Sequence, residues 1–421
     1  MLAVLRDEVT ELLSRLIRVD TTNPPGNETA AAVLLRDYLE ANGVECELIA
    51  RTPERANLVA RIKGSGGGPS LLIMGHTDVV LADSAEWSVP PFSGEVRNRE
   101  IWGRGALDMK SQVAANAVAI ASLAREGFRP SGDLIFAATA DEEVGAGFGL
   151  EWLCEAHPDA VRADFCINEG GGDRLEIGGT PYWICTVAEK MSAPFVIRVR
   201  GRSGHASMPG IADNALVKAA RLIERISSYA PARVVPPEVD AFLHTIGEKL
   251  ETLPPTIAEM VEPLLAPTFS PTMISASQKR NIIPAVCEIT VDCRLPPGTT
   301  PADAEPDIRR VLGDDVEYDI EFTEAQGGTR STFDTPLLRA AESFVSEVDP
   351  GAKVAPMITA GFTDSHWLRE AFGTVAYGFF PVRMAPELMA QLIHSADERI
   401  PVDDLELGLR WVRHAARALL A

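Results

Sequence analysis

The first part of the chain alternates between helical and strand-like patterns of hydrophobic residues. Apolar side chains recur every three or four positions over residues 5–17, and the same periodicity predicts helices near 28–41 and 110–125. Short apolar runs between these segments predict buried strands at 45–50, 57–62, 71–74, 133–139 and 164–168. Such alternation is typical of an α/β fold, in which helices cover both faces of a mixed sheet.

The pattern changes near residue 190. Over 195–200, Phe195, Ile197 and Val199 alternate with more polar neighbours, and residues 282–294 alternate in the same way, as in a sheet with one solvated face. Helices near 214–229 and before 316, with strands at 273–277 and 316–322, complete the β-α-β-β-α-β order of a ferredoxin-like α+β domain. The α/β pattern then resumes, so we expect a larger domain in two parts, 1–189 and 326–421, with 190–325 inserted.

Composition and charge exclude some classes of protein. The 421 residues are 46% hydrophobic and 24% charged, which is ordinary for a globular protein. Lys and Arg number 39 against 60 Asp and Glu, and a net charge of −21 would repel a nucleic acid. No apolar run has the roughly 20 residues that a membrane span needs, and six cysteines without a CxxC pair indicate reduced thiols in a cytoplasm. We therefore expect neither a nucleic-acid nor a membrane partner.

Candidate chemistry gathers after the predicted strands, where open α/β sheets place their ligands. Each residue alone has an ordinary explanation, since an acid after a strand is often a helix cap and a single histidine is more often structural. Taken together, so many carboxylates at one sheet edge would repel one another. The residues are His76, Asp78, Asp108, Glu142, Glu143, Glu169 and His394.

Bound divalent metal resolves this crowding. Asp108, Glu143 and Glu169 supply three negative charges, and with neutral His76 and His394 one zinc would leave a net charge of −1. Two zinc ions give +4 − 3 = +1, which a bridging hydroxide brings to zero. We therefore predict two Zn²⁺ ions, with Co²⁺ or Mn²⁺ as substitutes.

Two acids remain for other tasks. The i,i+2 spacing lets Asp78 accept the other ring N–H of His76, unless Asp78 is only a turn residue. Glu142, next to the ligand Glu143, is placed to take a proton from the attacking water and deliver it to a leaving amine. The alternative for Glu142 is a solvated acid.

At this point the chain resembles the di-zinc metallopeptidase family of aminoacylase, glutamate carboxypeptidase, acetylornithine deacetylase and succinyl-diaminopimelate desuccinylase. The matching motifs follow the order of that family over nearly the whole chain. They are GHTDVV at 75–80, WSVPPF at 87–92, WGRG at 102–105, DMK at 108–110, DEEVG at 141–145, GRSGHAS at 201–207, NIIP at 281–284, DCR at 292–294 and the late His394.

The resemblance implies a role for each matching residue. His76 and Glu169 would bind one metal, Glu143 and His394 the other, and Asp108 would bridge them. Asp78 would support His76 and Glu142 would be the general base. These assignments imply a catalytic di-metal domain at 1–189 and 326–421.

The same resemblance makes the inserted segment 190–325 a lid and dimerisation-type domain. Its His205 would stabilise the oxyanion, although a plain loop histidine is the alternative. Asn281 and Arg294 would hold a substrate carboxylate, with a strand-end salt bridge as the alternative for Arg294. Gly361 and Thr363 are further substrate-binding candidates, although Phe362 replaces a glycine found in many relatives.

We therefore expect hydrolysis of an amide bond in a small carboxylate-bearing substrate, a dipeptide, a C-terminal peptide bond or an N-acyl amino acid. A bridging hydroxide would attack, with Glu142 as general base. The alternative is a non-catalytic metal or ligand carrier on the same fold, while a phosphatase is disfavoured because no phosphate-binding loop is visible. The long segment 233–267 of the lid bears on whether the chain is a monomer or a homodimer through this domain, and on whether His205 serves its own chain or a neighbour's.

Overall fold

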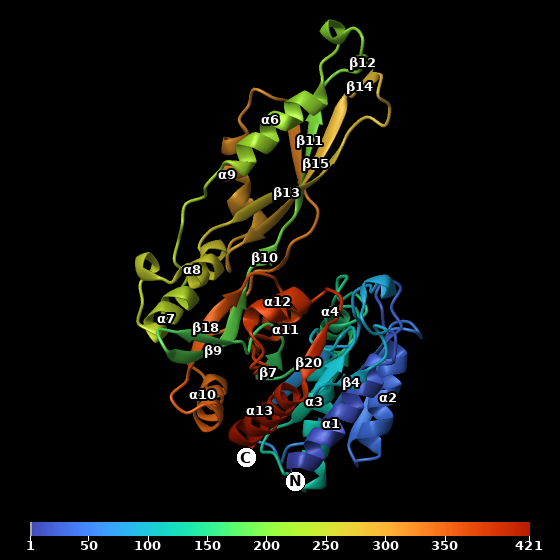
Figure 1. The fold of residues 1–421 in the computed structure, drawn as a ribbon, viewed down its shortest axis with the longest axis vertical. Coiled ribbons are helices and arrows are strands. Elements are labelled where there is room, and N and C mark those ends of the chain that lie inside the picture. The colour runs from blue at the N-terminus through green and yellow to red at the C-terminus, as the bar shows by residue number, and fades with distance from the viewer. Residues whose placement is uncertain (1) are drawn as a thin grey trace. The chain divides into compact units, whose positions relative to one another are not determined.

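The computed structural model describes residues 2–421, which divide into two compact units (Figure 1). The larger unit contains residues 2–187, 331–357 and 363–421, and the smaller unit contains 188–330 and 358–362. The smaller unit thus begins near the expected position 190, extends beyond 325, and includes a short segment that the sequence assigned to the larger domain. The functional names given to these segments stay predictions.

A nine-stranded mixed sheet forms the centre of the larger unit, in the order β1-β2-β6-β3-β7-β19-β9-β18, with β8 beside β9. The neighbours β6, β3, β7 and β19 run parallel, while β1, β2 and β9 join antiparallel. The strands are β1 (Glu45–Ala50), β2 (Ala56–Ile62), β3 (Leu71–His76), β6 (Leu134–Thr139), β7 (Phe165–Asn168), β8 (Arg174–Ile177), β9 (Thr180–Glu189), β18 (Lys353–Thr359) and β19 (Val375–Gly378). This bears out the mixed α/β sheet expected from the sequence.

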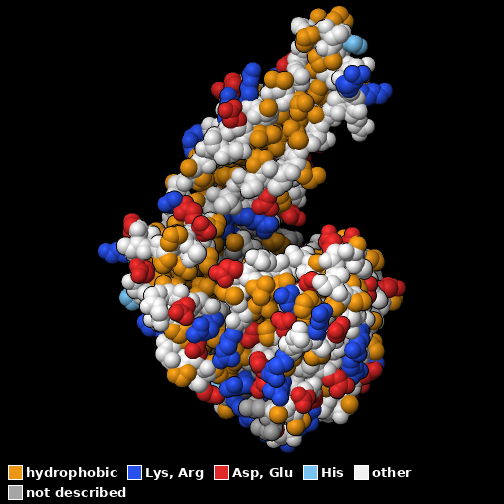
Figure 2. All heavy atoms as spheres, viewed as in Figure 1, with side chains coloured by type: hydrophobic (Ala, Val, Ile, Leu, Met, Phe, Trp, Pro, Cys, Tyr) orange, Lys and Arg blue, Asp and Glu red, His pale blue; other side chains and the backbone are white. Residues whose placement is uncertain are grey.

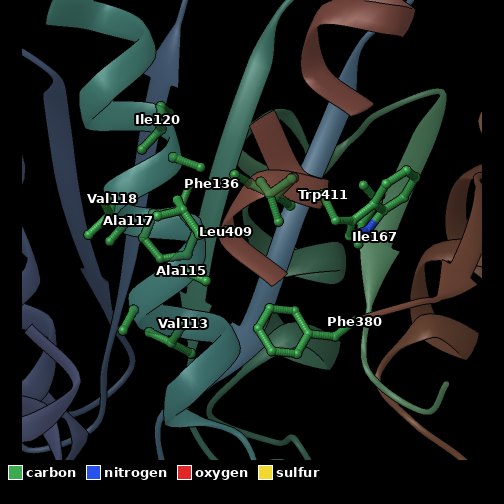
Figure 3. Packing of buried hydrophobic residues seen from close by; sticks show 14 of the residues in the cluster. Val113, Ala115, Ala117, Val118, Ile120, Phe136, Ile167, Phe380, Leu409 and Trp411 are labelled. Atoms are coloured by element: carbon green, nitrogen blue, oxygen red, sulfur yellow. The ribbon is translucent and has the colours of Figure 1, made fainter. Parts of the chain in front are cut away.

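Helices cover both faces of this sheet because its strands are apolar on both sides. In β3, Leu71 and Ile73 enter one hydrophobic core while Leu72 and Met74 enter another. Figure 3 shows part of the first core, where apolar side chains of α3 and α13 pack together with Phe136 of β6. The helices are α1 (Leu2–Ile17), α2 (Glu28–Glu40), α3 (Lys110–Arg125), α4 (Leu150–Ala156), α5 (Pro158–Val161), α10 (Pro336–Val348), α11 (Ser365–Phe372), α12 (Pro386–Leu392) and α13 (Val402–Leu420).

The smaller unit has its own antiparallel sheet and core. Its strands lie in the order β16-β11-β15-β10-β17, with β13 on β15, and the four long strands have the expected β-α-β-β-α-β connection. Alternate residues of β11 and β15 are buried, as their sequence pattern predicts. The elements are β10 (Met191–Ser192), β11 (Phe195–Arg200), β12 (Gly204–His205), α6 (Ala215–Ser227), α7 (Pro237–Ile246), α8 (Pro255–Val261), β13 (Thr268–Ser275), β14 (Ile282–Ile283), β15 (Val286–Leu295), α9 (Pro301–Leu312), β16 (Tyr318–Phe322) and β17 (Gln326–Gly327).

Several elements differ from the sequence expectation. The single strand expected at 282–294 is interrupted at Pro284, so that β14 pairs with β12 and β15 starts anew. Strand β13 begins at Thr268 rather than at 273, with a bulge between Pro271 and Met273. A three-stranded sheet of β4 (Glu95–Arg97), β5 (Glu100–Trp102) and β20 (Arg399–Pro401) was not predicted, because its strands are too short to show a pattern.

No helix within residues 2–421 is long and apolar enough to cross a membrane. All six cysteines are free thiols, and four of them are buried.

Candidate metal centre

The parallel strands bring the candidate residues to one edge of the large sheet. His76 is the last residue of β3, which continues two positions beyond its predicted end at 74. Glu142 and Glu143 follow β6, and Glu169 follows β7 directly. Since β6, β3 and β7 are parallel neighbours, their carboxyl ends lie side by side.

Two groups of side chains meet at this edge and share Asp108. His76, Asp108 and Glu169 form the first group, and Asp108, Glu143 and His394 form the second, with the ligand atoms of each group within 4.8 Å of one another. One oxygen of Asp108 lies 3.0 Å from Nε2 of His76 and the other 3.0 Å from Nε2 of His394. Nε2 of His394 also lies 3.4 Å from Oε2 of Glu143. The structure therefore brings together all five residues that the sequence proposed as ligands.

The contacts of Asp78 differ in part from the expectation. Nδ1 of His76 lies 3.0 Å from the main-chain oxygen of Asp78 and 3.5 Å from its carboxylate, so the main chain is the nearer acceptor. The buried carboxylate accepts the main-chain N–H groups of Glu142 and Glu143 at 3.2 and 3.1 Å. Asp78 thus orients the segment that carries Glu142 and Glu143, a function that sequence spacing did not indicate.

A buried polar network continues from Asp78. The Asn23 amide donates to the carboxylates of Asp78 and Asp141, both at 2.9 Å. Arg55 donates to Asp141 at 2.7 Å and forms a two-pronged pair with Glu28 at 2.6 and 2.7 Å. Asp141 has a left-handed backbone, with φ of 67°, directly before Glu142. These contacts hold an unfavourable backbone conformation that turns Glu142 and Glu143 out of the strand.

A second buried carboxylate fixes the loop before α3. Glu398 accepts the main-chain N–H groups of Gly105, Leu107 and Asp108 at 3.1, 2.7 and 3.0 Å. It also forms an ion pair of 2.7 Å with Arg104, and both side chains are almost completely buried. Glu398 thereby determines where Asp108 lies, just ahead of the first turn of α3.

The buried carboxylates at this site outnumber the positive charges that face them, and this shifts the pKa values of several groups. Burial and the charge of Glu169 raise the pKa of Glu142 well above its usual value, and burial also raises the pKa of Glu169. Hydrogen bonds to Asp108 and Glu143 raise the pKa of His394 to about 10. Burial opposes the ionisation of Asp108, but bonds with His394 and His76 lower its pKa overall.

The donor set fits divalent metal. Oε1 of Glu143 is buried and has no hydrogen-bond partner among the described residues, as expected of an oxygen that faces a cation. Imidazole and carboxylate donors without cysteine suit zinc and its substitutes. The residues present can therefore hold two ions with Asp108 between them.

Sequence reasoning missed three buried residues near this centre. Asp364 lies 3.4 Å from the hydroxyl of Thr139, and burial raises its pKa well above the usual value. Asp364 directly follows the predicted residue Thr363, and this was the only indication in the sequence that Asp364 lies near the site. Asn23 and Glu398 lie far from the motif residues they contact, and no local pattern pointed to them.

The remaining candidates lie in the smaller unit, except for Thr363. His205 of β12 is exposed, and its Nδ1 lies 2.7 Å from the hydroxyl of Ser207. The main-chain oxygen of Asn281 accepts the N–H of Ala206 at 3.0 Å, so Asn281 lies beside His205. Arg294 forms a two-pronged ion pair with Asp292, with both distances 3.0 Å. The part of these residues in substrate binding stays a prediction, as it does for Gly361 and Thr363.

Comparison with known proteins identifies the family. Residues 72–418 match the model of peptidase family M20/M25/M40. A succinyl-diaminopimelate desuccinylase from Methylobacterium sp. (strain 4-46) is 30% identical over 420 residues, covering 94% of this chain and 92% of the relative. The fold is similar to an M20 metallo-carboxypeptidase from Sulfolobus solfataricus (TM-score 0.75, 19% identity, 98% and 99% coverage) and to human carnosine dipeptidase 1 (0.70, 15%, 99% and 97%). The chain therefore belongs to the M20/M25/M40 family of peptidases.

Proposed function

We propose that the chain hydrolyses an amide bond in a small carboxylate-bearing substrate, a dipeptide, a C-terminal peptide bond or an N-acyl amino acid, with two zinc ions at the candidate centre. His76, Asp108 and Glu169 would hold one ion, and Asp108, Glu143 and His394 the other. Bound divalent ions would polarise the substrate carbonyl and make a water molecule easier to deprotonate. The observation that carries this proposal is the sharing of Asp108, one oxygen toward each histidine.

Glu142 is the general base in this proposal. Its Oε2 lies 3.9 Å from Nε2 of His76, and its side chain is only 14% exposed. Because burial and Glu169 raise its pKa, Glu142 holds a proton more firmly than an exposed glutamate does. It can therefore take the proton of the attacking water and pass it to the departing nitrogen. Glu142 is available for this task because the neighbouring Glu143 is the residue that would bind the metal.

Substitution of Glu142 by Gln tests this function. We expect the zinc content, measured by atomic emission, to stay at two ions, while kcat falls by about 10²–10⁴, the usual contribution of a general base. Glu155→Gln changes an exposed acid on α4 and serves as the matched control. Wild-type turnover in Glu142→Gln would exclude the mechanism, and zinc binding without hydrolysis of any dipeptide or N-acyl amino acid would support the non-catalytic alternative.

The substrate carboxylate is assigned to Arg294 and Asn281, with His205 toward the oxyanion and Gly361 and Thr363 as further contacts. Arg294 suits a carboxylate because its guanidinium donates two parallel hydrogen bonds. Nε and Nη2 of Arg294 already bond Asp292, so a bound carboxylate would use Nη1 or compete with Asp292. The names of the relatives, a desuccinylase, a carboxypeptidase and a dipeptidase, agree with cleavage of an amide.

The smaller unit also supports a homodimer. Strand β13 pairs with β15 alone among the described strands, so it forms an edge of its sheet. Met273 and Ile274 on β13 are 69% and 51% exposed, and Figure 2 shows hydrophobic side chains on the surface of this unit. We expect a dimer by light scattering and a monomer for Ile274→Lys, with Val96→Lys, an equally exposed position in the larger unit, as control. A monomeric wild-type protein would contradict this.

The free thiols support a cytoplasmic location, since disulfides are rare in that compartment. Burial raises the pKa of Cys166 and Cys185, which keeps them protonated and unreactive. Cell fractionation tests the location directly.

A further inference from the structure

A cavity of about 240 Å³ lies beside the candidate metal centre. Asp108 and Glu169 both line it, and every lining residue belongs to the larger unit. Pockets that enclose a whole small ligand usually have about 300–1,000 Å³. This cavity therefore has the size for one substituent of a substrate whose amide lies at the metals.

Apolar side chains from separate parts of the larger unit form most of the cavity wall. Phe380 and Val382 follow β19, Met389 belongs to α12, and Ile400 to β20. Phe380, Val382 and Ile400 are fixed by burial in the core, and Met389 is half-buried. A wall of this kind favours an apolar group, because each Å² of apolar surface that leaves water contributes about 25 cal/mol to the free energy of binding.

The cavity offers no cationic side chain to an anion. No Lys, Arg or His is among the described residues that line it, and its polar residues beyond the two ligands are Ser111, Gln112 and Asp173. Gln112 already donates its amide to the main-chain oxygen of Met74 at 3.2 Å. Two zinc ions with three ligand carboxylates and one hydroxide would carry no net charge, so the loaded centre would not replace the missing cationic side chains. A carboxylate entering the cavity would lose its water and meet Asp173, a further acid.

We propose that this cavity receives an uncharged, apolar substituent next to the scissile amide. The chain then prefers a leucine-like side chain or a branched acyl group over an aspartate or succinyl group of the same shape. This inference rests on the proposed amide hydrolysis. It separates the chain from its desuccinylase relatives, whose name specifies a succinyl group that ends in a carboxylate.

Isosteric substrate pairs test the proposal. The pairs are Leu-Gly with Asp-Gly, Gly-Leu with Gly-Asp, and 4-methylpentanoyl-glycine with succinyl-glycine, because the members of each pair differ only by an isopropyl group in place of a carboxylate. We expect the apolar member to have at least a tenfold higher kcat/KM at one or more of these positions. Binding to Glu142→Gln by calorimetry, with and without zinc, should show the same preference without turnover. Equal or reversed preferences overturn the proposal, as does tighter binding of Lys-Gly or Gly-Lys.

A charge added to the wall gives the sharper test. In Met389→Arg we expect the ratio of apolar to acidic kcat/KM, and of the two binding constants, to fall at least tenfold. Gln391→Arg places the same charge on the exposed side of α12 and should leave both ratios within twofold. Preference in binding without hydrolysis of any pair would refute the proposed function alone, whereas hydrolysis without preference would refute the cavity assignment alone.

Discussion

At the scale of single residues, the site depends on buried charges that satisfy one another in pairs. Arg55 serves two carboxylates, Glu28 and Asp141, and all three are almost completely buried. Loss of one partner of such a network leaves uncompensated charge in the interior, which costs more than the intact pair contributes. The arrangement therefore makes a residue outside every catalytic motif essential to the backbone before Glu142.

Arg55→Met should lower the free energy of unfolding by about 3–5 kcal/mol, because Glu28 and Asp141 would remain buried without their cationic partner. Arg61→Met in β2 breaks the ion pair with Asp133, whose partners are 26% and 33% exposed, and should cost about 0–1 kcal/mol. Urea denaturation measures both. If the free energy of unfolding fell equally in the two variants, burial of the Arg55 network would not add to its contribution to stability.

Histidine protonation gives a second expectation at this scale. Hydrogen bonds to Asp108 and Glu143 raise the pKa of His394 to about 10 in the metal-free protein, against 6.5 for an ordinary histidine. A raised folded-state pKa stabilises the protein fully below about pH 6.5, and this contribution is lost as the pH rises to about 10. Urea denaturation of chelator-treated protein at pH 6, 8 and 10 should show falling stability, with a flatter dependence in His394→Asn. An increase toward pH 10 in the wild type relative to this variant would contradict the assignment.

At the scale of elements, most of the candidate ligands lie in short loops, and the long buried helices and strands on either side keep these loops in place. Helix α3 and the parallel strands are buried almost throughout, whereas Asp108, Glu169 and His394 lie in segments between elements. The loop before α3 has few apolar residues of its own to bury, so its place is set by Glu398, which is contributed by a segment about 290 residues later in the chain.

Glu398→Gln should weaken zinc binding by about 10–100-fold, the usual effect of losing a group that orients a ligand. The amide has nearly the size of the carboxylate, but it is neutral and has only one oxygen. It therefore cannot form the ion pair with Arg104 and accept all three main-chain hydrogen bonds as Glu398 does. Competition with a chelator measures the affinity, and Glu387→Gln on the exposed side of α12 is the control. Unchanged affinity in Glu398→Gln would show that Asp108 is positioned without it.

Elements of the site could be predicted from sequence to the extent that they are local. The strands before His76, Glu143 and Glu169 show continuous apolar runs, and α3 matches its predicted bounds of 110–125. The support of these residues is not local, since Asn23 and Asp141 are 118 positions apart and meet only because the sheet brings them together. The interruption at Pro284 was missed because alternation continues on both sides of it.

At the scale of the whole molecule, the metal centre needs only the larger unit. All five candidate ligands belong to residues 2–187, 331–357 and 363–421, whereas His205, Asn281 and Arg294 belong to the smaller unit. The candidates for the substrate carboxylate and the oxyanion are therefore in a different part of the chain from the metal ligands, whereas the cavity beside the ligands belongs to the larger unit. Two zinc ions would change the formal charge from −21 to −21 + 4 = −17.

Zinc should stabilise the larger unit in particular. A ligand that binds only the folded state at 100 times its Kd adds about 2.7 kcal/mol for each ion. Calorimetric melting of zinc-loaded and chelator-treated protein should show a higher Tm with zinc. An identical Tm would mean that the ligands do not bind the ion in the folded chain.

The chain passes between the two units four times, and two of these crossings, at 187/188 and 330/331, lie next to each other. The N–H of Ser331 donates to the oxygen of Val187 at 2.8 Å, and Ala188 pairs with Arg330. A short glycine linker could therefore join 187 to 331 and remove residues 188–330, while residues 358–362 of the smaller unit stay in the chain. Such a shortened chain should still bind two zinc ions yet lose hydrolysis, and the segment of a relative that corresponds to 188–330 could be inserted at this junction to alter the choice of substrate.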